Sequence, residues 1–134
     1  MIGYSLGATV MMQLGSYQFS INTAAYQELR RRTAYSWAAQ ERFGKSANRQ
    51  FTGPGDDSIT LSGVIYTEFR GGIRQLDDMR RMAARGRPLL LIDGYGRVMG
   101  HWIIESIEEG QSVFAGFGRP RKQEFTMQIL RREP

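Results

Sequence analysis

Cysteine is entirely absent from this chain of 134 residues. Without cysteine there is no disulfide framework, no thiol nucleophile and no thiolate metal site, a lack that fits a reducing cytoplasm. Histidine occurs only once, as His101, and the usual spacings of histidine and carboxylate metal ligands do not occur. The composition therefore predicts neither a metal centre nor a bound cofactor.

Long apolar runs are missing as well. The stretch MIGYSLGATVMM at the amino end is too short to span a bilayer, and it lacks the basic start and the cleavage region of an export signal. We therefore expect a soluble intracellular protein with no membrane partner. Residues 1–11 are interpreted as either a flexible N-terminal arm or a mis-assigned start. Residues 12–134 are expected to form a single domain, because two domains would each have little core.

Lysine is scarce, and arginine supplies almost all of the positive charge. Of the 18 basic residues only Lys45 and Lys122 are lysine, and the formal net charge is +5. Arginine pairs with carboxylates and phosphates in a planar, two-bond geometry, so it serves protein interfaces as well as nucleic acids. Acidic residues lie among several of the arginines, which favours solvated or interface arginines paired with Asp and Glu. A small basic nucleic-acid-binding module is the alternative.

Turn signals and alternating side chains predict strands in the first half of the chain. Two short strands fit within residues 10–20, and a third fits residues 29–43. The segment GPGDD at residues 53–57 is rich in turn-forming residues, and residues 58–69 after it alternate between apolar and other side chains. We therefore expect a tight hairpin with GPGDD at its tip.

One helix is predicted in the middle of the chain, at about residues 72–86. Apolar residues recur at helical spacing there, Asp77 and Asp78 stand near its start, and Gly86 followed by Pro88 supplies a stop signal. The arginines near its carboxyl end complement the helix dipole.

Three further strands are predicted after the helix. The run at residues 89–92 is apolar throughout, which is typical of a strand covered on both faces. Residues 97–109 and 121–132 follow, joined by a long loop at 110–120. The order of elements favours an α+β fold, mainly an antiparallel β barrel or sandwich with the one helix packed on it.

Catalytic chemistry finds little support in these residues. An enzyme would need acids such as Asp56, Asp57, Asp93 or Glu68 to converge in a concave pocket. Turn geometry explains the first three of these acids, because Asp side chains bond their own backbone in tight loops. His101 lies in a predicted strand with no evident partner for acid–base work. We therefore expect a protein that is not an enzyme.

Two long stretches resemble the phage tail protein family called GpU, FTGPGDDSITLSGVIYTEFRGG and PLLLIDGYGRVMGHWIIE. The resemblance extends over roughly Met12 to Arg132. It implies a structural protein of contractile tails, of prophages or of tail-like bacteriocins (tailocins), required for tail assembly. It also implies a ring of six copies where the tail tube meets the baseplate hub, in contact with tube, sheath or hub proteins. Such a protein resides in the virion tail, after assembly in the host bacterial cytoplasm, and the family's pattern contains no catalytic or cofactor residues.

A ring subunit needs two different surface patches that mate head to tail. Strand edges, extended arms and arginine-rich rims are suited to this purpose. The candidate interface residues come from the basic segment near residue 30, the expected hairpin tip and the loop before the last strand. They are Arg30, Arg31, Arg32, Tyr35, Trp37, Pro54, Asp56, Asp57, Phe117, Arg119 and Arg121.

Overall fold

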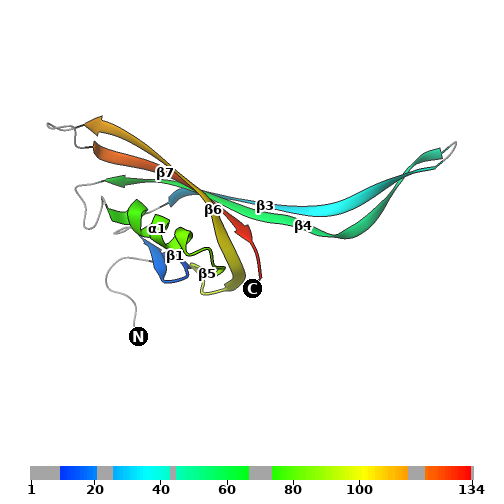
Figure 1. Ribbon diagram of the computed structural model, residues 1–134, viewed down its shortest axis with the longest axis horizontal. Coiled ribbons are helices and arrows are strands. Elements are labelled where there is room, and N and C mark those ends of the chain that lie inside the picture. The colour runs from blue at the N-terminus through cyan, green and yellow to red at the C-terminus, as the bar shows by residue number, and fades with distance from the viewer. Residues whose placement is uncertain (1–9, 21–25, 43–44, 67–73, 115–119, 134) are drawn as a thin grey trace.

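The computed structural model describes residues 10–20, 26–42, 45–66, 74–114 and 120–133 (Figure 1). Strands and one helix follow one another in these ranges: β1 (Val10–Leu14), β2 (Tyr17–Ser20), β3 (Tyr26–Arg42), β4 (Lys45–Tyr66), α1 (Gln75–Ala84), β5 (Leu89–Asp93), β6 (Val98–Phe114) and β7 (Pro120–Arg131). The expected α+β class, with an antiparallel sheet and one helix, is confirmed. Residues 1–9 of the N-terminal segment lie outside the described ranges, and Val10 and Met11 open β1.

All seven strands belong to one antiparallel sheet, in the order β2-β1-β5-β6-β7-β4-β3. Within the described ranges this sheet is open, with β2 and β3 at its ends, so the expected barrel or sandwich is not formed by a single copy. The reason lies in the unequal strand lengths. β4 pairs with β7 only from Ser58 to Tyr66, and the rest of β4 has β3 as its sole neighbour. A ribbon of two strands cannot close on itself.

β3 and β4 form a long hairpin, and the part of it that has no third strand beside it projects far from the body as an arm (Figure 1). We define the arm as Thr33–Arg42 of β3 with Lys45–Asp57 of β4. At about 3.3 Å per residue it is roughly 40 Å long. The body of the molecule holds the rest of the sheet and α1.

The core lies where α1 covers one face of the sheet. Alternate residues of β4 and β7 are buried, as their sequence alternation predicts, and β1, β2, β5 and β6 add further buried side chains. Full burial of each large apolar side chain stabilises the fold by about 1.5–3 kcal/mol. The core residues are Met12, Leu14, Phe19, Ile59, Leu61, Ile65, Leu76, Met79, Met82, Leu91, Trp102, Phe125, Met127 and Ile129.

The GPGDD segment does not form a hairpin tip, and that prediction is wrong. It lies in the middle of β4, where Gly53, Pro54 and Asp57 are opposite Ser36, Tyr35 and Thr33 of β3. The pairing register shifts within this segment, between Pro54 and Asp57, and again just before it, between Phe51 and Gly53, and Gly53 has a φ of 129°. Glycine and proline are tolerated there because they form an irregularity in a two-stranded ribbon rather than in a central strand. The hairpin instead reverses between the paired residues Arg42 and Lys45.

Two smaller predictions about the second half also need correction. Within the expected loop at residues 110–120, β6 continues to Phe114 and β7 begins at Pro120, and residues 115–119 lie outside the described ranges. β5 is not covered on both faces, because Leu91 is fully buried while Leu90 is 36% exposed. The turn after β5 is as predicted. The Asp93 carboxylate accepts hydrogen bonds from the backbone N–H groups of Tyr95 and Arg97.

Candidate subunit interface

The candidates Arg30, Arg31 and Arg32 lie on β3, the strand at one end of the sheet. Within the described ranges β3 pairs only with β4, so its outer edge has no partner strand. Arg30 forms an exposed ion pair with Glu28, with 2.9 Å between Nε and Oε1. Arg32 is exposed and makes no ion pair with the residues that the structure describes. This edge therefore presents backbone hydrogen-bonding groups together with exposed positive charge.

Arg31 is held by a carboxylate of the same chain. Its guanidinium donates two hydrogen bonds to the Asp57 carboxylate, Nε to Oδ1 at 2.9 Å and Nη2 to Oδ2 at 2.6 Å. The Thr33 hydroxyl donates a third hydrogen bond to Oδ1. The hydrogen bond from Arg31 is the main reason why the pKa of Asp57 lies below its usual value. The guanidinium also lies over the ring of buried Trp102, 5.6 Å from its centroid. Arg31 and Asp57 thus fasten the base of the arm to the body.

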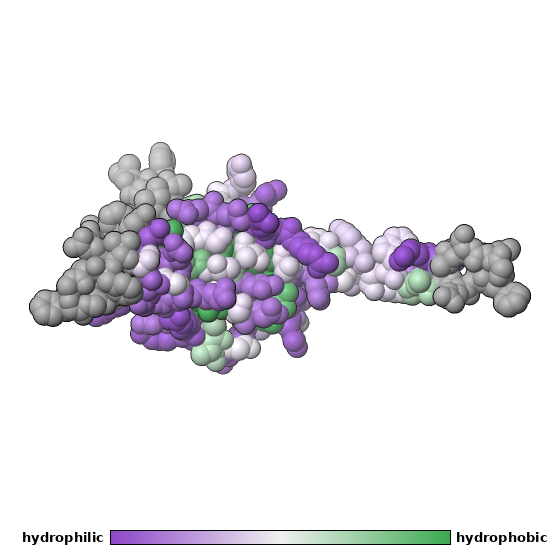
Figure 2. Space-filling view, turned by 90° about the horizontal axis from the view of Figure 1, so that it is seen from above, coloured by the Kyte–Doolittle hydropathy of each residue, from purple (hydrophilic) through white to green (hydrophobic). Residues whose placement is uncertain are grey.

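Aromatic side chains cluster on the arm. Trp37 and Phe51 are opposite each other across the two strands, and their ring centroids are 5.1 Å apart in an edge-to-face arrangement. Trp37 is 53% exposed, Phe51 50% and nearby Tyr35 63%. Pro54 is opposite Tyr35. Figure 2 shows the described part of the arm as a narrow extension with a mostly pale surface that includes small light green areas and a purple patch. Three exposed aromatic side chains close together are unusual for a part of the chain that packs against no core.

The sequence did not point to Phe51 as an interface residue. A turn at GPGDD would place Phe51 opposite residues that follow the turn, away from Trp37. A turn placed between Arg42 and Lys45 would have brought the two aromatic residues together.

Of the remaining candidates, only Asp56 is described with its side chain. Asp56 is exposed near the base of the arm. Phe117 and Arg119 lie outside the described residues, and Arg121 belongs to β7 but its side chain is not described. The candidate residues therefore do not form a single cluster. Those that can be placed with their side chains all lie along the β3–β4 hairpin.

A second unpaired edge is found on β6. The pairing of β5 with β6 ends at Trp102, so from Ile103 to Phe114 the described part of β6 has only β7 beside it. This stretch contains Glu105, Glu108 and Glu109 and no arginine or lysine. Glu105 and Glu108 are exposed. The sheet thus has a basic open edge on β3 and an acidic open edge on β6, and sequence reasoning did not identify the acidic edge.

Glu109 connects this acidic edge to the helix. It accepts hydrogen bonds from Gln111 at 2.6 Å, from Arg80 at 2.7 Å and from Gln123 at 3.2 Å. The hydrogen bond from Gln111, followed by those from Arg80 and Gln123, lowers the pKa of the Glu109 carboxyl. Glu109 therefore has partners within the chain, whereas Glu105 and Glu108 face the solvent.

Several other arginines are paired with acids, as the sequence predicted. Arg80 also bonds Asp77, and Arg81 pairs with Asp78 at 2.6 Å. Among the acids considered for an enzyme, Asp57 binds Arg31 and Asp93 binds Arg97 at the turn after β5, whereas Glu68 lies outside the described residues. Within the described part of the chain, no group of three or more His, Cys, Asp or Glu side chains is placed to hold a metal ion. No helix among the described residues is long and apolar enough to cross a membrane.

Comparison with known proteins now assigns the chain to a family. Residues 15–133 match the family described as Phage P2 GpU. The chain belongs to the Phage P2 GpU family. A probable tape measure protein of Halomonas phage phiHAP-1 is 32% identical over 120 residues. That alignment covers 88% of this GpU-family chain and 14% of the Halomonas phage protein, so the chain spans a small part of that relative's length.

Solved structures from phage tails and related particles share this fold. The Dit protein (gp 19.1) of phage SPP1, from a hub adsorption apparatus, has a TM-score of 0.64 at 12% identity, over 92% of this chain and 50% of Dit. A chain from the tail of a gene transfer agent particle, with C6 symmetry, has a TM-score of 0.55 at 16% identity, over 94% and 92% of the two chains. A chain from the sheath–tube complex of a contractile injection system, PVC, reaches 0.50 at 12% identity, over 96% and 89%. At these identities the likeness establishes a shared fold.

Proposed function

We propose that this GpU-family chain is a structural, non-enzymatic component of a phage tail or tail-like particle. In this proposal it forms a ring where the tail tube meets the baseplate hub. The single observation that carries the proposal is the presence of two open edges of opposite charge on one sheet, β3 and β6. The family and the fold shared with hub and tail proteins support it.

The strand directions suit pairing between copies. Three antiparallel steps lead from β6 through β7 and β4 to β3, so β6 and β3 run in opposite directions. In a ring all copies are related by rotation, and the β3 strand of one copy therefore meets the β6 strand of the next in antiparallel orientation. When this β3–β6 pairing is repeated around the ring, the sheets of all copies join into one continuous sheet. If the rotation between copies closes the ring, that sheet closes into a barrel. The barrel expected from the sequence is thereby proposed to form between copies.

Charge supports head-to-tail pairing over the alternatives. Arg30 and Arg32 on β3 meet Glu105 and Glu108 on β6 in this arrangement, whereas pairing of two β3 edges would bring like charges together. We propose six copies, by analogy with the C6 symmetry of the gene transfer agent tail. The partners in this proposal are further copies and adjacent tube, sheath or hub proteins. The chain is placed in the virion tail after assembly in the host cytoplasm.

Charge reversal at the two edges tests the ring. Native mass spectrometry of the purified chain should give the mass of six copies, and Arg30→Glu with Arg32→Glu should shift the protein to monomer. Adding Glu105→Arg and Glu108→Arg in the same chain should restore the ring, because the β3 edge is then acidic, the β6 edge is basic, and the two edges attract each other again. Arg74→Glu with Arg85→Glu, at the ends of α1, makes the same charge change away from both edges and should leave the ring intact. A ring that survives the β3 reversal would rule out these edges as the joint.

The nucleic-acid alternative is not favoured by any contact in the structure. Arg31, Arg80 and Arg81, which would contribute to a basic stripe, are each occupied by a carboxylate. The proposal predicts only weak, nonspecific association with DNA. Tight binding that falls steeply with salt would instead support the alternative.

A further inference from the structure

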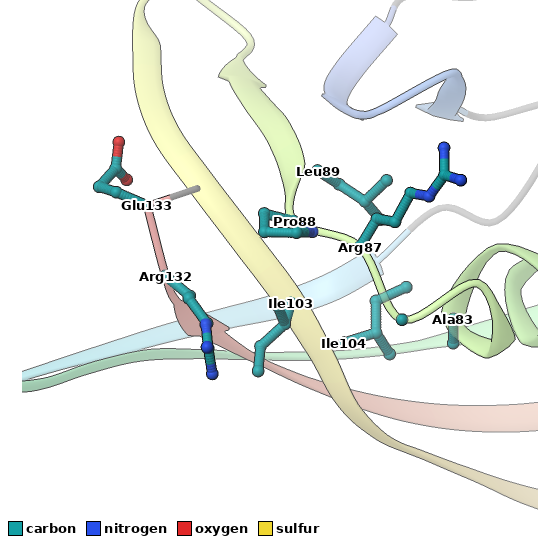
Figure 3. Close-up of a pocket in the computed structure, with 9 residues that line it drawn as sticks. Ala83, Arg87, Pro88, Leu89, Ile103, Ile104, Arg132 and Glu133 are labelled. Atoms are coloured by element: carbon teal, nitrogen blue, oxygen red, sulfur yellow. The ribbon is translucent and has the colours of Figure 1, made fainter.

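A pocket of about 470 Å³ lies on the body beside the carboxyl end of α1 (Figure 3). Its apolar wall consists of Ala83 from α1, Pro88 and Leu89 at the start of β5, and Ile103 and Ile104 from β6. The volume falls in the range of about 300–1,000 Å³ that is usual for pockets that bind small molecules or large side chains.

Two arginines and one acid, Glu133, stand at the rim of this pocket. Arg87 precedes Pro88, and Arg132 follows β7 on another side of the opening (Figure 3). Neither arginine forms an ion pair with the residues that the structure describes. A guanidinium in this position can lie over the face of an aromatic ring, an attraction worth about 0.5–2 kcal/mol. Apolar walls with a basic rim therefore suit an aromatic occupant.

The arm carries aromatic side chains that lack a partner surface. Trp37 and Phe51 contact each other edge to face, and each remains about half exposed. A two-stranded hairpin is only marginally stable in water without packing against another surface. Trp, Tyr and Arg are also the residues that most often dominate the binding energy of protein interfaces. The arm is therefore suited to packing against another molecule through Trp37 and Phe51.

We propose that the Trp37–Phe51 pair of one copy docks into the pocket bounded by Ala83, Leu89 and Ile103 of a second copy. Within one molecule the arm extends away from α1 and β5, so it cannot reach its own pocket (Figure 1). The contact joins two different patches, which makes it a head-to-tail contact able to form a ring or a stack of rings. This inference rests on the proposed ring and extends it, and the pocket adjoins the open β6 edge at Ile103 and Ile104.

The absence of cysteine allows a direct test by cross-linking. Two single variants of the full chain, Phe51→Cys and Ala83→Cys, are mixed and treated with a short bis-maleimide. The mixture should give a covalent dimer in high yield, and each variant alone should give little. As a matched control, Phe51→Cys is mixed with Tyr95→Cys, whose parent side chain is 88% exposed at the turn after β5, and this mixture should give little dimer.

Each of the other outcomes would overturn the docking. Efficient cross-linking of Phe51→Cys with itself would indicate arm-to-arm packing. Equal yields with Ala83→Cys and Tyr95→Cys would indicate random collision, and no dimer in any mixture would indicate that the pocket does not receive the arm.

Tryptophan fluorescence gives a second readout without cross-linking. The chain has two tryptophans, and Trp102 is already fully buried, so a change in emission on association reports on Trp37. Docking should move the emission to shorter wavelength as the protein concentration rises. Trp37→Phe should abolish this shift, and so should Ala83→Arg, which fills the pocket with a residue that helices tolerate well.

The two proposals can fail separately. If Ala83→Arg leaves the fluorescence shift unchanged while native mass spectrometry detects the ring, the docking is wrong and the ring stands. If the edge reversals leave the assembly intact while Ala83→Arg disrupts it, the arm rather than the sheet edges joins the copies.

Discussion

Arg31 and Asp57 show how individual side chains hold the arm to the body. They lie at the point where β4 loses β7 as a neighbour and continues with β3 alone. The carboxylate of Asp57 is mostly buried and has three hydrogen-bond donors around it. Asp56, next to it in the chain, is exposed and has no ion pair within the described residues.

Asp57→Asn should lower the free energy of unfolding by about 1 kcal/mol, because it leaves Arg31 without its charged partner. The loss of stability is small because the Arg31 side chain is 38% exposed and solvent screens the ion pair. Asp56→Asn is the matched control and should change stability by less than about 0.5 kcal/mol. Urea denaturation followed by circular dichroism measures both variants. Equal effects at the two positions would contradict the role given to Asp57.

The same ion pair predicts a pH dependence. The pKa of Asp57 is lowered in the folded chain, so its contribution is fully present above the ordinary carboxyl pKa of about 4. It is lost as the pH falls through the lower folded pKa, because the folded chain must then take up a proton at this site. The stability difference between wild type and Asp57→Asn should therefore shrink below pH 4. A difference that stays constant down to pH 2 would exclude this linkage.

A close backbone contact at Gly94 gives another prediction for a single residue. A Cβ atom at this position would lie 2.9 Å from the backbone oxygen of Met11, which belongs to β1. Gly94→Ala should therefore destabilise the fold by about 1–3 kcal/mol, because a backbone contact relaxes poorly. Gly110→Ala is the control, since its Cβ would meet nothing closer than 3.9 Å. Thermal unfolding of both variants tests this, and an unchanged melting temperature for Gly94→Ala would count against the contact.

Among the elements, those in the body could be predicted well from the sequence, and the arm could not. The alternation in β4 and β7 and the spacing in α1 identify these elements because one of their faces is buried in the core. The arm has no core to impose alternation, and the turn residues of GPGDD dominate its local pattern. The open edges of β3 and β6 follow from the order of the strands in the sheet. Short sequence patterns do not determine that order.

Hydrogen exchange should separate the arm from the body in the isolated chain. Amides of the arm, such as those of residues 48–52, have one neighbouring strand and no core beneath them. They should exchange much faster than amides at residues 59–65, which lie in a central and buried part of β4. Mass spectrometry of peptic fragments measures this difference. Equal protection of both segments in the monomer would show that the arm is stable without a partner.

At the scale of the whole molecule, the described chain presents two open sheet edges, on β3 and β6, and one projecting arm. An open edge invites pairing with another chain, and these two differ in charge, which selects the order of pairing. The sequence resemblance correctly identified the family, while the surfaces that would join the copies became visible only when the strand order was known.

Electron cryomicroscopy of assembled particles that contain this chain tests the central claim most directly. We predict a ring of six copies in which β3 of each copy pairs antiparallel with β6 of the next. A ring whose copies meet only through other surfaces, or particles that assemble fully without this chain, would contradict the account.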